Sequence, residues 1–382
     1  MWNRIRRRPL AALSLVSKRR PHSRVPLYFA VQWLGIIAVV SLYPFSGWTD
    51  SGEPLFDFLF YPLPYYNIAF DNAVNILAYM PYGFALALVP RRWGGVCAVL
   101  LAGLTSLSME LIQLYLPNRI ASNLDLICNT LGAAIGAFLA LNPWALAFGR
   151  WAKRWRDRHF CLGWVTDYSL MLIVLWFLTQ IDPSTPFFGI VTMPRGLPQP
   201  FLSPIADPAL FLFLVEAGGA MCNLTATLCF VLACSTTTYE RLRCVVFFLA
   251  AAILLKMGVA GLFLKPMAFF EWINLRVLIG LGVGLAALPV LLRLPRVALL
   301  IGSVVGFTAT NYLSSQWPLT AADTLELLDI FRWSYGHLLN MHALADISSQ
   351  VWSWAAMACS LCGVWQSLFP PPSSRDNWDF VD

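Results

Sequence analysis

Long apolar stretches alternate along this chain with short polar or basic segments. A helix that crosses a lipid bilayer needs about 20 mostly apolar residues, and ten stretches approach or reach that length. They lie near residues 27–46, 70–90, 93–116, 125–147, 161–181, 209–234, 244–264, 277–292, 297–313 and 350–369. The eighth is short, and a helical segment near 336–346 suits the membrane surface. The pattern predicts an all-α, polytopic transmembrane helical bundle of about ten spans.

The composition excludes an ordinary soluble protein. Of the 382 residues, 58% are hydrophobic and 12% are charged, against roughly 25% charged in soluble domains. The formal net charge of +6 would suit nucleic acid if it formed one patch, but the basic residues are spread between the apolar stretches. We therefore expect membrane lipids as partners and no nucleic acid.

The basic residues also predict the orientation. If the N-terminus is cytoplasmic, 20 of the 26 Lys and Arg residues fall in inside segments, five fall in outside segments, and Lys256 lies within a span. Such a bias places both termini in the cytoplasm. The predicted organisation is a basic cytoplasmic segment (1–26), a four-span domain (27–148), a basic cytoplasmic linker (149–160), a six-span region (161–369) and a cytoplasmic tail (370–382).

Polar side chains should converge at the outer ends of the second, third and fourth spans. Residues three or four positions apart share one face of a helix, and the predicted orientation places these residues at similar depth. Ionisable residues inside a membrane are costly, which makes each one a candidate functional residue. The candidate binding residues are Asp71, Asn75, Glu110, Gln113, Arg119, Asp125 and Asn129.

Small residues and a proline near this cluster have predicted structural roles. Gly132 and Gly136 form a small-xxx-small stripe, which allows close approach of a neighbouring helix. Pro81 removes a backbone hydrogen bond and should kink the second span, widening the space beside Asn75. The alternative to a binding site is a structural network in which Arg119 pairs with an acid and the amides hold the helices together. Three acids for one arginine favour the binding site.

These residues resemble a known family. The aspartate and asparagine of the second span, the MPYG turn with Pro81 and Gly83, and the acid-xx-Gln, Arg, Asp-xxx-Asn-xx-Gly-xxx-Gly order from Glu110 to Gly136 resemble a VanZ-like domain at about 65–142. The segment Ile330 to Trp352 is similar to the carboxyl end of longer bacterial members.

The resemblance implies a protein of the bacterial cytoplasmic (inner) membrane and cell envelope. In founding members it implies a contribution to tolerance of teicoplanin-type glycopeptides, an antibiotic resistance trait. Some members carry a basic or histidine residue soon after the first aspartate, where this chain has Asn72 and Asn75. That departure argues against a simple proton-transfer role for the second span.

The second half contains isolated charges within spans. Glu216 and Lys256 lie at similar depth in the sixth and seventh spans, which predicts a structural intramembrane ion pair between them. Asp167 lies near arginines at 150–158 and should pair with one of them. The outer segment 314–349 contains acids together with His337 and His342, whose spacing favours a surface helix or lid over a metal site. No metal and no cofactor are predicted.

Three functions remain as hypotheses. The first is a protein that binds or modulates an envelope lipid, a lipid-linked sugar or a cell-wall precursor through the outer-facing polar cluster, with Arg119 meeting a phosphate or carboxylate. The second is an integral-membrane transferase that uses Glu110 or Asp125 as general base. The third is a small-solute transporter, which the two dissimilar halves of the chain disfavour.

Overall fold

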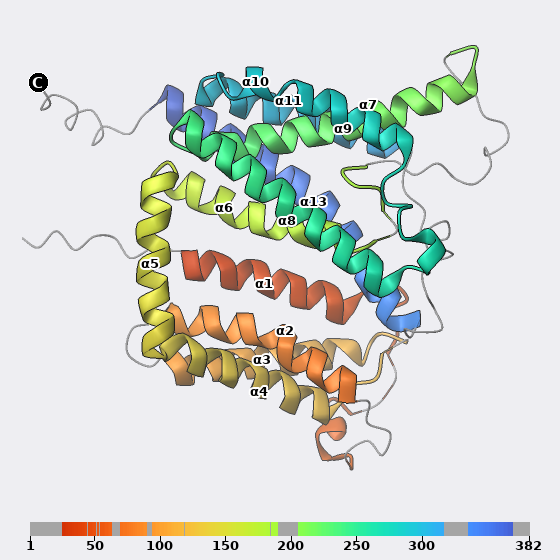
Figure 1. Cartoon of the computed structure of the whole chain (residues 1–382). Helices are drawn as coiled ribbons and strands as arrows, with labels where there is room; N and C mark the ends of the chain where they lie inside the picture. The colour runs from red at the N-terminus through yellow and green to blue at the C-terminus, as the bar shows by residue number, and fades with distance from the viewer. Residues whose placement is uncertain are drawn as a thin grey trace, which may run out of the picture.

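The chain folds as a bundle of helices. The computed structural model describes residues 25–43, 45–50, 52, 54–62, 69–89, 94–117, 119–183, 185–189, 205–316 and 335–369. Every regular element in these ranges is a helix, and the predicted all-α fold is confirmed (Figure 1). The helices are α1 (Val25–Leu42), η1 (Asp57–Phe60), α2 (Ala69–Leu88), α3 (Gly94–Gln113), α4 (Asn123–Leu141), α5 (Pro143–His159), α6 (Trp164–Trp176), η2 (Phe177–Gln180), α7 (Pro208–Ala233), α8 (Thr238–Phe263), η3 (Pro266–Ala268), α9 (Leu275–Ala286), α10 (Leu288–Leu291), α11 (Arg296–Gln316) and α13 (Tyr335–Leu368).

The length and composition of these helices are those of a multi-pass membrane protein. Among the described residues, six helices are long and apolar enough to cross a bilayer: α1, α3, α4, α7, α8 and α11. Two further apolar segments, α6 with η2 and α9 with α10, are shorter. α2 carries Asp71, Asn72 and Asn75 in its first two turns, which lowers its hydropathy. The count of ten spans and the cytoplasmic termini stay predictions.

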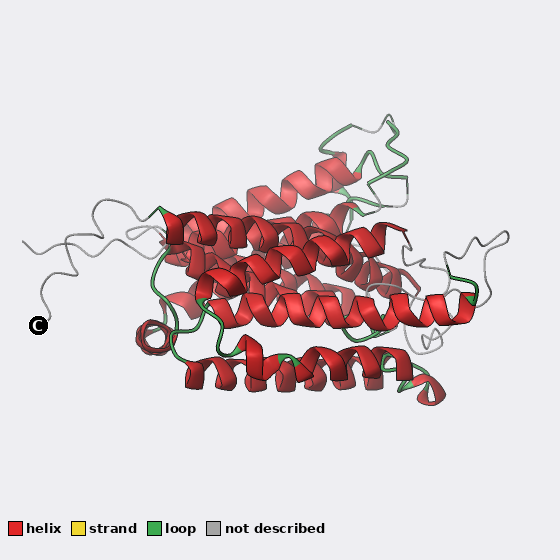
Figure 2. Ribbon diagram, turned by 90° about the horizontal axis from the view of Figure 1, so that it is seen from above, coloured by secondary structure: helices red, strands yellow, loops and turns green. Residues whose placement is uncertain are grey.

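The helices form two groups with α1 between them. α2, α3 and α4 pack on one another, α6 to α13 form the larger group, and α1 contacts α2 and α3 on one side and α6 and α13 on the other (Figure 1). Most helices run along a common direction (Figure 2). α5 crosses one end of the bundle at a steep angle and joins α4 to α6 (Figure 1). We call this end the α5 end and the opposite end the far end.

The segment predicted as a linker is a helix. α4 ends at Leu141, several residues before the predicted end of the fourth span, because Asn142 and Pro143 start a new helix: the Asn142 side chain accepts a hydrogen bond from the Trp144 backbone N–H. α5 buries none of its residues. Trp144, Phe148, Trp151 and Trp155 recur at helical spacing and are exposed, beside the arginines of the last turn. Such a composition is typical of a helix that lies in the membrane interface.

The last helix is longer than predicted. α13 runs without a break from Tyr335 to Leu368, so the separate surface helix near 336–346 is its first part. The acids between Asp323 and Asp329 lie outside the described residues, as do the side chains of His337 and His342.

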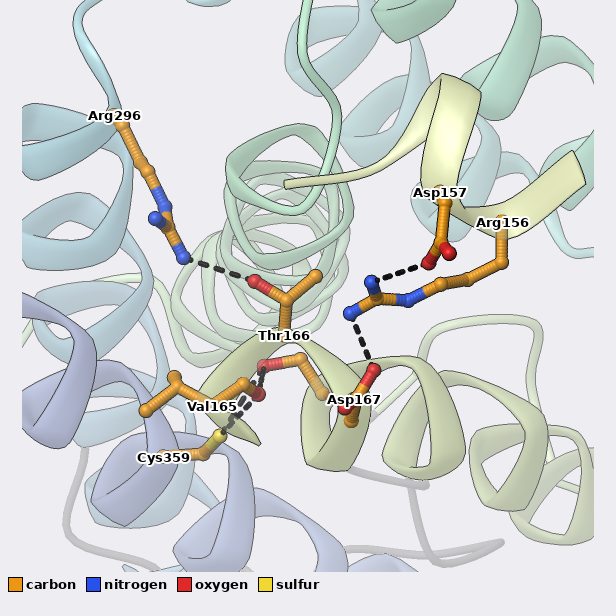
Figure 3. Close-up of polar contacts among 8 residues, drawn as sticks. Arg156, Asp157, Val165, Thr166, Asp167, Arg296 and Cys359 are labelled. Atoms are coloured by element: carbon orange, nitrogen blue, oxygen red, sulfur yellow. Dashed lines mark hydrogen bonds and ion pairs between the residues drawn. The ribbon is translucent and has the colours of Figure 1, made fainter. Parts of the chain in front are cut away.

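Polar contacts hold α5, α6 and α11 together at the α5 end. Arg156 of α5 pairs with Asp157 and with Asp167 of α6, which confirms the predicted arginine partner of Asp167 (Figure 3). Arg296 at the start of α11 donates to the Thr166 hydroxyl at 3.1 Å (Figure 3). The first turns of α6 and α11 therefore meet at this end, and both helices run from it toward the far end.

The predicted ion pair between Glu216 and Lys256 is wrong. α7 packs mainly on α9 and α11 and only weakly on α8, its neighbour in sequence, so a short loop does not bring the two charges together. Glu216, 4% exposed, instead accepts from Arg276 Nη1 at 3.0 Å and from the Asn274 amide at the start of α9. Lys256, fully buried, donates from Nζ to the Asp182 carbonyl at 2.6 Å and to Thr185 Oγ1 at 3.1 Å.

Candidate functional site

At the far end, the turn between α3 and α4 bonds to the end of α1. The last carbonyl groups of a helix lack backbone donors. Arg119 Nη2 donates to the carbonyls of Val40 at 3.1 Å and Tyr43 at 3.4 Å, and Gln113 Nε2 donates to the Ser41 carbonyl at 2.9 Å. A cation at this position is also favoured by the helix dipole. Arg119 and Gln113 therefore cap α1, a helix that had not been assigned to the site.

Glu110 takes part in the cap of the next helix. Ser122 precedes α4, and its hydroxyl accepts from the Asp125 backbone N–H at 3.4 Å. In a capping box the acid three residues on would accept from the N-cap backbone N–H. Here Glu110 Oε2 accepts from Ser122 N at 2.8 Å instead. This leaves the Asp125 carboxylate available to another helix.

Asp125 meets α2. Its Oδ1 accepts from Asn75 Nδ2 at 2.9 Å, and Asp71, one turn before Asn75, lies close enough to interact electrostatically with Asp125. The three residues are partly exposed, whereas Glu110 is only 3% exposed. The cluster therefore has partly exposed acids at Asp71 and Asp125 and a buried acid at Glu110.

The interior of the cluster contains two residues that the sequence prediction missed. Asn129 Nδ2 donates to Ser106 Oγ at 2.9 Å, and Ser106 is fully buried on α3, one turn before Glu110. Tyr79 of α2, 3% exposed, lies beside Ser106. Asp71, Asn75 and Tyr79 are spaced by four residues, so extending that face by one turn would have found the tyrosine.

Glycines bring α2 and α4 into backbone contact. A Cβ added at Gly132 would overlap the Ile76 carbonyl, one at Gly136 the Met80 carbonyl, and one at Gly83 the Ala133 carbonyl. α2 continues through Pro81 without a break, and its predicted kink stays a prediction. The close contact holds Asn75 against Asp125.

Burial and a neighbouring acid act in opposite directions on Arg119. Removal from water lowers the pKa of its guanidinium below the usual value, and the nearby Glu110 carboxylate raises it by a smaller amount. An arginine stays protonated in proteins at neutral pH. It therefore supplies positive charge close to an acid-rich cluster.

One family model matches the part of the chain that carries this cluster. The family model described as VanZ/LLP1 matches residues 16–147. This range is therefore similar to a VanZ-like domain, and we call it the VanZ-like domain. Neither the comparison with curated proteins nor the comparison with solved structures gives a match.

The matched range is close to the predicted four-span domain at 27–148 and longer than the segment that carries the resemblance. The resemblance was assigned to about 65–142, whereas the matched range includes α1. The hydrogen bonds from Gln113 and Arg119 to the end of α1 give a physical reason, since the α3–α4 turn needs that helix end as its acceptor. Residues beyond 147 are an extension of the domain.

The contacts of Arg119 predict a role in stability. In the VanZ-like domain, Arg119→Gln should lower the free energy of unfolding by about 1–2 kcal/mol, because two carbonyls of α1 lose a charged donor. The melting temperature of the protein in detergent would measure this. Arg150→Gln, on the exposed surface of α5, is the matched control and should leave the melting temperature unchanged. Equal melting temperatures for the two variants would contradict the assigned role.

Proposed function

We propose that the VanZ-like domain binds the polar head of an envelope lipid, a lipid-linked sugar or a cell-wall component at the far end of the bundle. The observation that carries the proposal is the partly exposed acid pair Asp71 and Asp125, with Asn75 between them and Glu110 behind. The helices that carry Asp71 and Asp125, α2 and α4, are already joined by backbone contact at the glycines. The packing of α2 on α4 does not require three acidic side chains, so a second role for them is expected.

The charges support a ligand rich in hydrogen-bond donors. Ionised carboxylates only accept hydrogen bonds, so hydroxyl or ammonium groups suit Asp71 and Asp125. Arg119 donates to the carbonyls of α1, which supports a positioning role for it in place of the phosphate contact first expected. Sugar hydroxyls and the amines of cell-wall peptides both provide such donors.

The biological setting belongs to the same proposal. The family resemblance supports placement in the bacterial cytoplasmic membrane, and the distribution of basic residues supports a far end that faces outward. A protein that binds a cell-wall precursor there would alter access of teicoplanin-type glycopeptides to their target, and tolerance would follow.

Replacing both surface acids tests the proposal. Asp71→Asn with Asp125→Asn keeps the size and an acceptor oxygen at each position but removes both charges. We expect about tenfold weaker binding, which corresponds to about 1.4 kcal/mol, of a polyprenyl-diphosphate-linked saccharide measured by native mass spectrometry. Asp157→Asn at the α5 end is the control for loss of one charge.

Unchanged binding in the double variant, at unchanged melting temperature, would rule out this site. Labelled lipid should be followed in the same samples. Its conversion by the wild-type protein, lost in Glu110→Gln, would favour the transferase hypothesis over simple binding.

A further inference from the structure

A polar cavity lies in the extension, outside the VanZ-like domain. It has a volume of about 430 Å³ and is lined by residues of η2, α7, α11, α13 and the segment after η2. The end of α6, the end of α11 and the first half of α13 meet there, so the cavity belongs to the far end. Its volume is in the range of small-molecule sites.

The cavity wall is polar but carries little charge. Its hydrogen-bonding side chains include Gln180, Asn223, Thr310, Asn311, Ser349 and Ser353. None of the described lining residues is Lys or Arg. Asp182 lines the wall, and Lys256 interacts with its charge from behind, where Nζ also bonds the backbone of the same segment. Among the described lining residues, no side chain carries a positive charge that would neutralise a phosphate.

Three of the lining hydroxyls already use their donor within the protein. Thr310 Oγ1 donates to the Gly306 carbonyl, Ser349 Oγ to the Asp346 carbonyl and Ser353 Oγ to the Gln350 carbonyl. A hydroxyl has one donor and two acceptor positions, so each of these three keeps only acceptor capacity for a ligand. Asp346 adds a carboxylate to the same wall.

Gln180 provides a buried acceptor without a partner. Its side chain is 7% exposed, and its Nε2 donates to Thr179 Oγ1 at 2.9 Å. Its Oε1 has no hydrogen-bond partner. A buried carbonyl oxygen without a donor costs about 1–3 kcal/mol. A ligand hydroxyl in the cavity would supply the missing donor.

Indole rings add apolar surface to the cavity. Trp176 and Trp352 are almost fully buried, whereas Trp354 is 61% exposed. An aromatic ring provides an apolar face for the C–H groups of a sugar ring, while neighbouring polar groups fix its orientation. We propose that this cavity binds a neutral, hydroxyl-rich saccharide, either free or as the head of a glycolipid.

Binding to the full chain in nanodiscs tests the proposal with two kinds of probe. Tritium-labelled maltotriose and chitotriose test free saccharides. Monoglucosyldiacylglycerol, measured by native mass spectrometry, tests a glycolipid, and phosphatidylglycerol is the anionic comparison. Saturable binding of a trisaccharide would show that the ligand is a free saccharide. Binding of the glycolipid alone would show that the ligand is the head of a membrane lipid. If none of the three sugar probes binds, or if phosphatidylglycerol binds as well as they do, the proposal is overturned.

Three variants locate the binding. Gln180→Met removes the acceptor at similar size and should weaken binding about tenfold. Trp354→Leu removes the exposed ring and should weaken binding about fivefold. Trp365→Leu is the matched control, because Trp365 lies on the same helix, is 65% exposed and is not among the lining residues. Should Gln180→Met fail to fold, Trp354→Leu still decides the matter. Equal affinity of Trp354→Leu and Trp365→Leu would overturn the proposal.

Discussion

Arg276→Met is expected to destabilise the protein by roughly 3 kcal/mol, because it leaves the carboxylate of Glu216 buried beside one neutral donor. Glu216 is 4% exposed and accepts from Arg276 and from the Asn274 amide. Asn274 also caps α9, since its Oδ1 accepts from the Val277 backbone N–H at 2.9 Å. Unfolding by sodium dodecyl sulfate in mixed micelles would measure the loss of stability.

A second substitution identifies the partner. Glu216→Gln added to Arg276→Met should recover all but about 1 kcal/mol, because no buried charge is left unpaired. Glu216→Gln combined with Lys256→Met should give additive losses, since these two residues bond to different segments. The pairing would be misassigned if the losses of stability from the Glu216 and Arg276 substitutions were additive. It would also be misassigned if Glu216→Gln recovered the stability lost in Lys256→Met.

Gly136→Ala should destabilise the VanZ-like domain by roughly 3 kcal/mol or more, with Gly132→Ala close behind. The added methyl group would overlap the Met80 carbonyl in the first case and the Ile76 carbonyl in the second. Backbone atoms cannot turn aside as a flexible side chain can, so α2 and α4 must separate along their extensive contact. Lower yield of folded protein and a lower melting temperature are the expected readouts.

Gly282→Ala is the control for this prediction. Gly282 lies within α9, and nothing is found within 4 Å of a Cβ placed there. Alanine has the higher helix propensity, by about 1 kcal/mol, so this variant should be neutral or slightly more stable. If Gly136→Ala behaves in the same way, the two helices are not in backbone contact.

Local pattern was sufficient to predict the helices and part of the site. Each predicted apolar stretch contains a helix, because the apolar runs are long and bounded by prolines, arginines or polar turns. The helical spacing of Asp71 with Asn75, and of Asp125 with Asn129, correctly placed these residues at one end of α2 and α4. Such inferences need only the geometry of a single helix.

Partners between distant helices could not be predicted in this way. The pair of Glu216 with Arg276 depends on α7 packing against α9 in preference to α8, and no sequence pattern encodes that choice. The hydrogen bonds of Arg119 to α1 depend on a helix 76 or more residues earlier in the chain. By contrast, the SNLD segment at Ser122 is a capping signal and could have revealed that N-cap.

The place of α1 between the two groups of helices affects how the protein is made. α1 is synthesised long before α13, yet the two helices are in contact. Gln32 of α1 lines a crevice with Tyr168 of α6 and Ser348 of α13, and both atoms of its amide group are buried. During synthesis this amide faces lipid or water until α13 arrives. Chains truncated before α13 should therefore expose a polar group on α1 and become substrates for membrane quality control.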